Sequence, residues 1–173
     1  MPRCAWCSDD PLYIDYHDSE WGVPTRDPQV LFEFLILEGA QAGLSWITVL
    51  RKRERYRQVL FGFDPKRLAQ MTDAEIDECM LDAGIIRNRR KLEAARRNAQ
   101  LWLELEDPSG WLWSFVGGEP EDQPFRVDQP DAGGDRRSRG HEPWVEEGRV
   151  RLCRPDHLLR FYAGVRHGHG PHH

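Results

Sequence analysis

The sequence predicts an all-α fold built from short helices, and three features of the chain carry that prediction. Apolar residues recur with helical spacing in several segments of the first 118 residues, and no segment there convincingly resembles a strand. Helix-start signals stand ahead of these segments. Glycine and proline separate them. We therefore expect a helical domain over residues 1–118, followed by a divergent segment over residues 119–173 that does not complete its core.

The first helices are marked by their own signals. Asp27-Pro28 has the form of a cap followed by proline in the first turn, and it precedes an apolar run that ends at Glu38. After a glycine-containing break, Ser45 is expected to cap one amphipathic helix that continues to Leu60. The other face of that helix would carry a cluster of basic residues.

Further helix starts follow along the chain. Asp64-Pro65 repeats the cap-and-proline pattern, and Thr72 stands three residues before Glu75 in the form of a capping box. A long helix is expected over residues 88–105. After the proline that ends it, residues 111–116 predict a short apolar helix. Residues 1–26 show little periodicity and are expected to be held by packing or by a metal.

A glycine turn at residues 82–86 joins two of these helices. A helix, a glycine turn and an arginine-rich helix together place backbone N–H groups and positive charge at a helix N-terminus, which suits a phosphate group. The alternative is an ordinary pair of helices with a solvated charged face. The local sequence, taken alone, favours that alternative.

The charge and hydropathy of the 173-residue chain argue against several kinds of protein. A net charge of -5 argues against a protein that coats nucleic acid non-specifically, although basic clusters at residues 51–57 and 87–97 permit a local contact with DNA. No apolar run approaches the ~20 residues of a membrane span, and the N-terminus lacks the apolar core of a signal peptide. We expect a cytoplasmic protein, and we expect it to be a monomer.

Cysteine and histidine near the N-terminus are candidate metal ligands. In a reducing compartment, the 4 cysteines of the chain are expected to be metal ligands or buried thiols before disulfides. Cys4, Cys7 and His17 have the chemistry that zinc prefers, but a structural zinc needs four ligands and this segment supplies two or three. The alternative, a partly buried thiol and a hydrogen-bonded histidine, is favoured by these residues alone.

A glutamate and a tryptophan flank the break after the first apolar run. Glu38 closes that run and Trp46 follows shortly after it. A carboxylate against aromatic rings can hydrogen-bond a purine edge and favour a cationic ring, whereas Glu38 on its own would be interpreted as a surface residue. The chain also has 7 tryptophans, which require either a rich core or an aromatic-lined pocket.

Several of these segments together resemble one known family. The run over residues 37–50 is similar to a signature of the 3-methyladenine DNA glycosylase I family. Further segments of the chain are similar to that family as well, namely residues 3–6, 11–13, 16–18, 20–24 and 82–87. The similarity is nearly collinear from residue 1 to about residue 118. It implies a helix–hairpin–helix glycosylase fold and hydrolysis of the N-glycosidic bond of 3-methyladenine in double-stranded, alkylated DNA, the first step of base excision repair.

The resemblance also implies roles for single residues. Glu38 would be the catalytic carboxylate that hydrogen-bonds the excised base. Tyr16 and Trp46 would line the base pocket, and Trp21 and Trp6 would help to shape it. A cationic methylated adenine is attracted to such electron-rich rings and is a good leaving group. No Schiff-base lysine is required, so we expect no lyase activity.

DNA and zinc contacts follow from the same resemblance. The loop through Gly43 and Leu44 would probe the base stack, and the hairpin at Gly84 and Arg87 would hold the DNA backbone. The family binds a structural zinc through two N-terminal ligands, matched here by Cys4 and His17, and through a C-terminal histidine and cysteine four residues apart.

The second half of that zinc site is missing from the sequence. No His-x-x-x-Cys pattern occurs after residue 118. Residues 155–171, back-translated and read one base later, give a sequence similar to the family's C-terminal helix. We therefore predict a frameshift that makes the last ~43 residues foreign to the fold and leaves the zinc site with half of its ligands. Loss of the zinc and of a core helix should weaken the protein, since a typical stability is only about 5–15 kcal/mol.

Three other functions remain open from the sequence. One is a non-catalytic DNA-binding module, which would not require Tyr16, Glu38 and Trp46 together. Another is a zinc-dependent hydrolase at the N-terminal cysteines, which lacks an HExxH-type pairing. The third is an inactive, frameshifted relic of the glycosylase, which differs from the first interpretation in its state and not in its ancestry.

Overall fold

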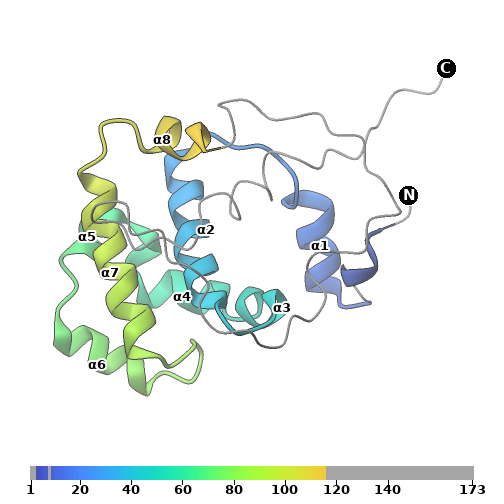
Figure 1. Cartoon of the computed structure of the whole chain (residues 1–173). Helices are drawn as coiled ribbons and strands as arrows, with labels where there is room; N and C mark the ends of the chain where they lie inside the picture. The colour runs from blue at the N-terminus through green and yellow to red at the C-terminus, as the bar shows by residue number, and fades with distance from the viewer. Residues whose placement is uncertain (1–2, 8, 116–173) are drawn as a thin grey trace.

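A computed structural model describes residues 3–7 and 9–115, and this part of the chain is helical with no strand (Figure 1). The elements are η1 (Ala5–Cys7), α1 (Pro11–Ser19), α2 (Pro28–Gln41), α3 (Trp46–Leu50), α4 (Arg53–Val59), η2 (Phe61–Phe63), α5 (Pro65–Ala69), α6 (Asp73–Leu81), α7 (Arg89–Leu103) and α8 (Pro108–Ser114). The all-α prediction is confirmed for these residues. The predictions for residues 119–173 lie outside the described part of the chain. None of the described helices is both long and apolar enough to cross a membrane.

Four helices begin at the same two-residue signal, an aspartate followed by proline. In each of them the aspartate side chain accepts a hydrogen bond from a backbone N–H of the first turn, and proline occupies a position where no N–H is needed. The capping aspartates are Asp10, Asp27, Asp64 and Asp107. The predicted capping box of α6 is also present, with Thr72 and Glu75 each bonded to the other's backbone N–H.

The structure differs from the predicted helices in three places. Residues 11–19 form α1, where an irregular segment was expected. The single helix expected after Ser45 is two, because the chain turns at Lys52, whose Nζ donates to the carbonyl of Ala83 at 2.8 Å. The short helix α8 begins at Pro108, which starts this helix instead of only ending the preceding one.

The central helix of the fold is α2. Figure 1 shows it between α7 and α5 on one side and α1 and α3 on the other. Its buried side chains are Leu31, Phe32, Glu33, Phe34, Leu35, Ile36, Leu37 and Ala40. A helix that is apolar on nearly every side belongs in a core, and burial of each large apolar side chain contributes about 1.5–3 kcal/mol.

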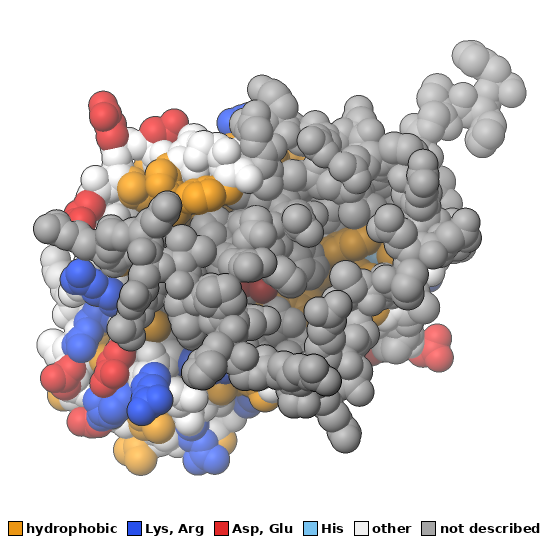
Figure 2. All heavy atoms as spheres, viewed as in Figure 1, with side chains coloured by type: hydrophobic (Ala, Val, Ile, Leu, Met, Phe, Trp, Pro, Cys, Tyr) orange, Lys and Arg blue, Asp and Glu red, His pale blue; other side chains and the backbone are white. Residues whose placement is uncertain are grey.

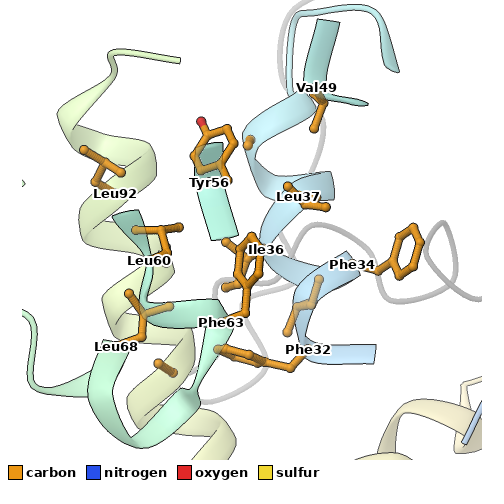
Figure 3. Packing of buried hydrophobic residues seen from close by; sticks show 14 of the residues in the cluster. Phe32, Phe34, Ile36, Leu37, Val49, Tyr56, Leu60, Phe63, Leu68 and Leu92 are labelled. Carbon is orange, nitrogen blue, oxygen red and sulfur yellow. The ribbon is translucent and has the colours of Figure 1, made fainter. Parts of the chain in front are cut away.

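The core side chains of α2 point in two directions. In Figure 3, Leu60 and Phe63 lie on one side of the helix, and Phe34 points away on the other side. The first direction builds the packing against α5, η2 and α7. The second direction brings α2 against α1 and α3, and the candidate active site lies there.

Candidate active site

Three buried aromatic rings from three helices meet at the end of the core. Tyr16 of α1 lies 5.6 Å from Trp46 of α3, measured between ring centroids. Phe34 of α2 stacks on Trp46 at 6.2 Å with an interplanar angle of 23°, and it lies 6.5 Å from Tyr16. Each ring is 5% exposed or less. The structure therefore brings the two predicted pocket residues Tyr16 and Trp46 together.

The two other predicted pocket tryptophans extend this group of rings. Trp6 lies 6.5 Å from Tyr16 and 5.2 Å from Trp21, with the last pair edge to face. His17 stacks on Trp21 at 5.1 Å with an interplanar angle of 18°. Tyr13 packs against Trp6 at 4.8 Å. We call the residues Trp6, Tyr13, Tyr16, Trp21, Phe34 and Trp46 the aromatic cluster.

Glu38 lies one helical turn after Phe34 on the same face of α2, at the edge of the aromatic cluster. Its side chain is partly buried, and removal of its carboxyl group from water raises the pKa of Glu38 to about 7. No residue in the described part of the chain makes a hydrogen bond or ion pair with this carboxyl group. Glu38 is therefore close to half ionised at neutral pH, and no described residue occupies the hydrogen-bonding capacity of its carboxyl group.

The charge of Glu38 acts on its neighbour Tyr16. Burial and the nearby negative charge of Glu38 raise the pKa of Tyr16 far above its ordinary value. The phenol is consequently a neutral hydrogen-bond donor at any physiological pH. Together, the carboxyl group and the surrounding rings offer one hydrogen-bond acceptor and several electron-rich faces, which suits a flat cation.

The predicted probe loop follows Glu38 directly. Residues 41–44 form a β-turn closed by a 2.6 Å hydrogen bond from the Leu44 N–H to the Gln41 carbonyl. Gly43 has φ +80°, a left-handed conformation that glycine adopts without strain. Leu44 is 41% exposed. The loop therefore presents an apolar side chain beside the aromatic cluster, as an intercalating probe requires.

The predicted hairpin lies between α6 and α7. Asp82 accepts a 2.7 Å hydrogen bond from the Gly84 N–H, and Arg55 binds the same carboxylate. A Cβ atom at Gly84 would lie 2.6 Å from the Cγ of Arg55, so the close packing of this turn requires glycine. The Ile86 N–H donates to the buried Tyr56 hydroxyl, which fixes the turn from below.

One arginine at this hairpin is left without a carboxylate. Arg87 is exposed and has no partner among the described residues. Figure 2 shows lysine and arginine side chains interspersed with aspartate and glutamate side chains at the lower left of the molecule, over the region of α6 and α7. In that region Arg89 pairs with Asp77, and Arg96 pairs with Asp73. The hairpin thus has the form of a backbone-binding turn, with N–H groups at the start of α7 and an uncompensated cation beside them.

From the sequence, the first basic cluster, at residues 51–57, permits a local contact with DNA, whereas in the structure most of its charge is bound within the protein. Its arginines are held by carboxylates of the protein itself, in the pairs Arg51–Asp10, Arg53–Glu20, Arg53–Glu33, Arg55–Asp82 and Arg57–Glu33. Arg53 is the most buried of them, with 12% of its side chain exposed. This cluster therefore joins α1, α2, α4 and the hairpin, and it contributes little free charge for DNA.

The candidate zinc ligands lie where η1 packs on α1. The Nδ1 atom of His17 is 2.9 Å from the Oδ1 atom of Asp18, an arrangement that orients a histidine for a metal at its Nε2 atom. Cys4 precedes η1, and Cys7 is buried. No group of three or more potential ligands occurs among the described residues. Cys4 and His17 have the chemistry of zinc ligands, and zinc stays a prediction.

The sequence analysis missed Phe34 and Tyr13. Phe34 lies inside a continuous apolar run, where nothing separates a pocket residue from a core residue. Its spacing of four residues from Glu38 was an available signal, because residues i and i+4 share one face of a helix. Tyr13 carries no such signal, since α1 itself was not predicted.

Comparison with known proteins agrees with this geometry. The sequence model described as "Methyladenine glycosylase" matches residues 6–133. The chain is 53% identical over 122 residues to a DNA-3-methyladenine glycosylase of Haemophilus influenzae, covering 68% of this chain and 66% of the relative. It is 50% identical over 125 residues to DNA-3-methyladenine glycosylase 1 of Escherichia coli, covering 70% and 67%. The matched segment thus spans about two thirds of the length of these curated relatives.

Solved structures resemble the fold as well. A crystal structure of 3-methyladenine DNA glycosylase I superposes with a TM-score of 0.69 at 50% identity, over 71% of this chain and 70% of the other. A variant of such an enzyme in complex with 3-methyladenine superposes with a TM-score of 0.67 at 40% identity, over 72% and 69%. Since the family model matches well over half of the chain, the chain belongs to the methyladenine glycosylase family.

Proposed function

We propose that this chain is a monofunctional DNA glycosylase that hydrolyses the N-glycosidic bond of 3-methyladenine in alkylated double-stranded DNA, the first step of base excision repair. The observation that carries the proposal is the partly buried Glu38 carboxyl group, unpaired among the described residues, at the edge of the aromatic cluster. The relatives named above, which are DNA-3-methyladenine glycosylases, support the same reaction.

Recognition of the lesion would rest on charge. Extrusion of a base from the duplex costs a few kcal/mol, and it costs least for a damaged base. The methylated adenine is cationic, and contacts with the faces of Tyr16 and Trp46 are each worth about 0.5–2 kcal/mol. A cation beside Glu38 favours the ionised carboxylate, so binding of the lesion shifts this residue toward the form that accepts hydrogen bonds from it.

Hydrolysis would follow from the same charge. The positive ring is already a good leaving group, so the enzyme needs no strong general acid. Glu38 would hold the departing base through a hydrogen bond and stabilise the charge as the bond to the sugar breaks. Of the three lysines of the chain, Lys52 and Lys91 have ammonium groups bound by backbone carbonyls, and Lys66 lies on α5, on the side of α2 opposite to α1 and α3 (Figure 1). We therefore propose no lyase activity.

The solved relatives support these roles. They include a variant with tyrosine replaced by phenylalanine, in complex with 3-methyladenine, and a variant with glutamate replaced by glutamine. The site described above likewise holds a tyrosine, Tyr16, and a glutamate, Glu38. We propose that Tyr16 and Glu38 contact the base in this chain, with Trp6, Trp21 and Trp46 around it.

Release of free base from methylated duplex DNA tests the proposal. Wild-type protein should release 3-methyladenine and leave abasic sites that break only on treatment with alkali. Glu38→Gln should lower the single-turnover rate by about 10²-fold, the lower range for loss of a group acting in proton transfer or charge stabilisation. Binding of duplex DNA without release of any base would instead support the non-catalytic DNA-binding module.

The zinc and the C-terminal segment need a separate experiment. We propose that Cys4 and His17 bind a structural zinc, and that its other ligands come from a C-terminus like that of the family. The natural protein would have this C-terminus if the frameshift is an error in the printed sequence. Intact mass and zinc content of the protein expressed from its native gene test both points. A family-type mass with one zinc supports them, whereas a mass matching these 173 residues without zinc supports an inactive relic.

The remaining expectations concern assembly and location. We propose that the protein acts on DNA as a monomer in the bacterial cytoplasm, which agrees with the bacterial relatives. Light scattering of the purified protein, with and without a duplex, tests the first of these points. A stable dimer that persists at low protein concentration would contradict it.

A further inference from the structure

Lys91, in the first turn of α7, contacts the end of another helix. Its Nζ atom donates a 2.7 Å hydrogen bond to the carbonyl oxygen of Ala40 and a 2.8 Å hydrogen bond to that of Ala42. Ala40 belongs to the last turn of α2, and Ala42 caps that helix. Carbonyls at a helix C-terminus lack partners within the helix and carry partial negative charge, so a lysine is well suited to bind them.

The Ala42 carbonyl also determines the shape of the probe loop. Ala42 has φ −40° and ψ 116°, and Gly43 has φ +80°, which are close to the values of a type II turn. Type I and type II turns differ by a flip of the peptide between these two residues. Because Lys91 binds the oxygen of that peptide, its ammonium group favours the type II form.

The same contact links three parts of the candidate site. Glu38 lies in the helical turn that Lys91 caps, and the exposed Leu44 closes the β-turn that Lys91 fixes. Lys91 itself lies in the first turn of α7, the helix that follows the hairpin at Gly84. The neighbouring cations have different partners, since Arg89 pairs with the carboxylate of Asp77.

We propose that Lys91 is a positioning residue that couples the hairpin's contact with the DNA backbone to the placement of the probe loop and of Glu38. The proposal rests on the proposed glycosylase function for its effect on base release, but the structural link itself does not depend on it. A hairpin docked on DNA would then hold the loop in its type II form at the moment when Leu44 enters the base stack.

Lys91→Met tests the proposal, with Lys66→Met as the matched control. Both changes remove one ammonium group and keep an unbranched side chain, and Lys66 is an exposed lysine of α5 whose ammonium group has no partner in the described part of the chain. In Lys91→Met we expect single-turnover base release to fall ~10- to 100-fold, the scale of a misplacement of about 1 Å. Amide hydrogen exchange of residues 41–45 should accelerate. Lys66→Met should change neither quantity.

Salt dependence separates positioning from direct binding of a phosphate. Loss of a phosphate contact lowers the slope of log affinity against log salt concentration by about one, whereas loss of a positioning contact leaves the slope unchanged. A reduced slope in Lys91→Met, or normal exchange of residues 41–45, would overturn the proposal. If the wild-type protein releases no base, the proposed function fails on its own, and the exchange measurement still decides the role of Lys91.

Discussion

The raised pKa of Glu38 means that this candidate catalytic residue lowers the free energy of unfolding by a measurable amount. Its pKa is about 7 in the folded protein and 4.5 in the reference state. Below pH 4.5 the carboxyl group is neutral in both states and costs nothing. As the pH rises from 4.5 to 7, the unfolded chain loses the proton and the folded protein retains it, so unfolding becomes more favourable. Above pH 7 the cost is constant at about 3 kcal/mol, since one pKa unit corresponds to about 1.4 kcal/mol.

Glu38→Gln should therefore stabilise the protein while it impairs base release. Glutamine does not titrate, so the variant avoids the cost of burying a carboxylate. We expect the free energy of unfolding of the variant to exceed that of the wild type by an amount that grows between pH 5 and pH 7 and reaches about 3 kcal/mol at pH 8. At pH 4.5 most of this pH-dependent gain should be absent.

Urea denaturation of both proteins across this pH range measures the difference. Asp64→Ala serves as a control, because this exposed residue caps α5 far from the site and its effect on stability should not follow the titration of Glu38. A difference between Glu38→Gln and the wild type that is constant from pH 5 to pH 8 would refute the reasoning. It would mean that the carboxyl group is solvated or already paired in the folded protein.

Three other substitutions test the packing and capping of the fold. Gly84→Ala should lower stability by about 1–3 kcal/mol and weaken DNA binding, because the new Cβ meets the Arg55 side chain; urea denaturation and a duplex-binding titration measure the two effects. Glu33→Gln should destabilise by ~3 kcal/mol in urea denaturation, because it leaves the buried Arg53 with Glu20 as its remaining carboxylate; an unchanged midpoint would contradict this. The Asp64→Ala control should itself cost about 1 kcal/mol, with base release unchanged in the glycosylase assay.

The helix starts could be predicted from the sequence because their causes are local. A capping aspartate and the proline after it act within one helical turn, so the Asp-Pro pair alone predicts the starts of α2 and α5. The start of α1 at Asp10-Pro11 carries the same signal. It was missed because α1 has nine residues of mixed polarity, with no periodicity to support a helix.

The packing between helices could not be predicted in the same way. The break between α3 and α4 interrupts a segment whose apolar residues have the spacing of one continuous helix. The carboxylates that hold Arg53 lie 33 and 20 residues earlier in the chain, so no local pattern pairs them with it. The family resemblance predicts Tyr16 and Trp46 as the two main residues of a base pocket. Their contact with each other depends on how α1 and α3 pack on α2, which only the structure shows.

The distribution of charge around the aromatic cluster explains how one small domain can favour both a cationic base and an anionic backbone. Arg53 lies 4.9 Å from the ring of Phe34, directly behind the cluster, where an unbalanced cation would repel a methylated base. Glu20 and Glu33 both bind that guanidinium, so its field is neutralised inside the protein. Glu38, which makes no ion pair in the described part of the chain, then sets the sign of the site.

At the hairpin the unpaired charge is positive, whereas at the aromatic cluster it is negative. The positive charge of Arg87 is unpaired because no described carboxylate approaches it, and Arg87 stands beside the N–H groups that begin α7. Negative charge is thus left free where the base would enter, and positive charge where the phosphates would lie. The two regions are joined through α7 and Lys91. A chain with a net charge of -5 can therefore bind DNA, because local pairing, and not the total, decides which charges face the ligand.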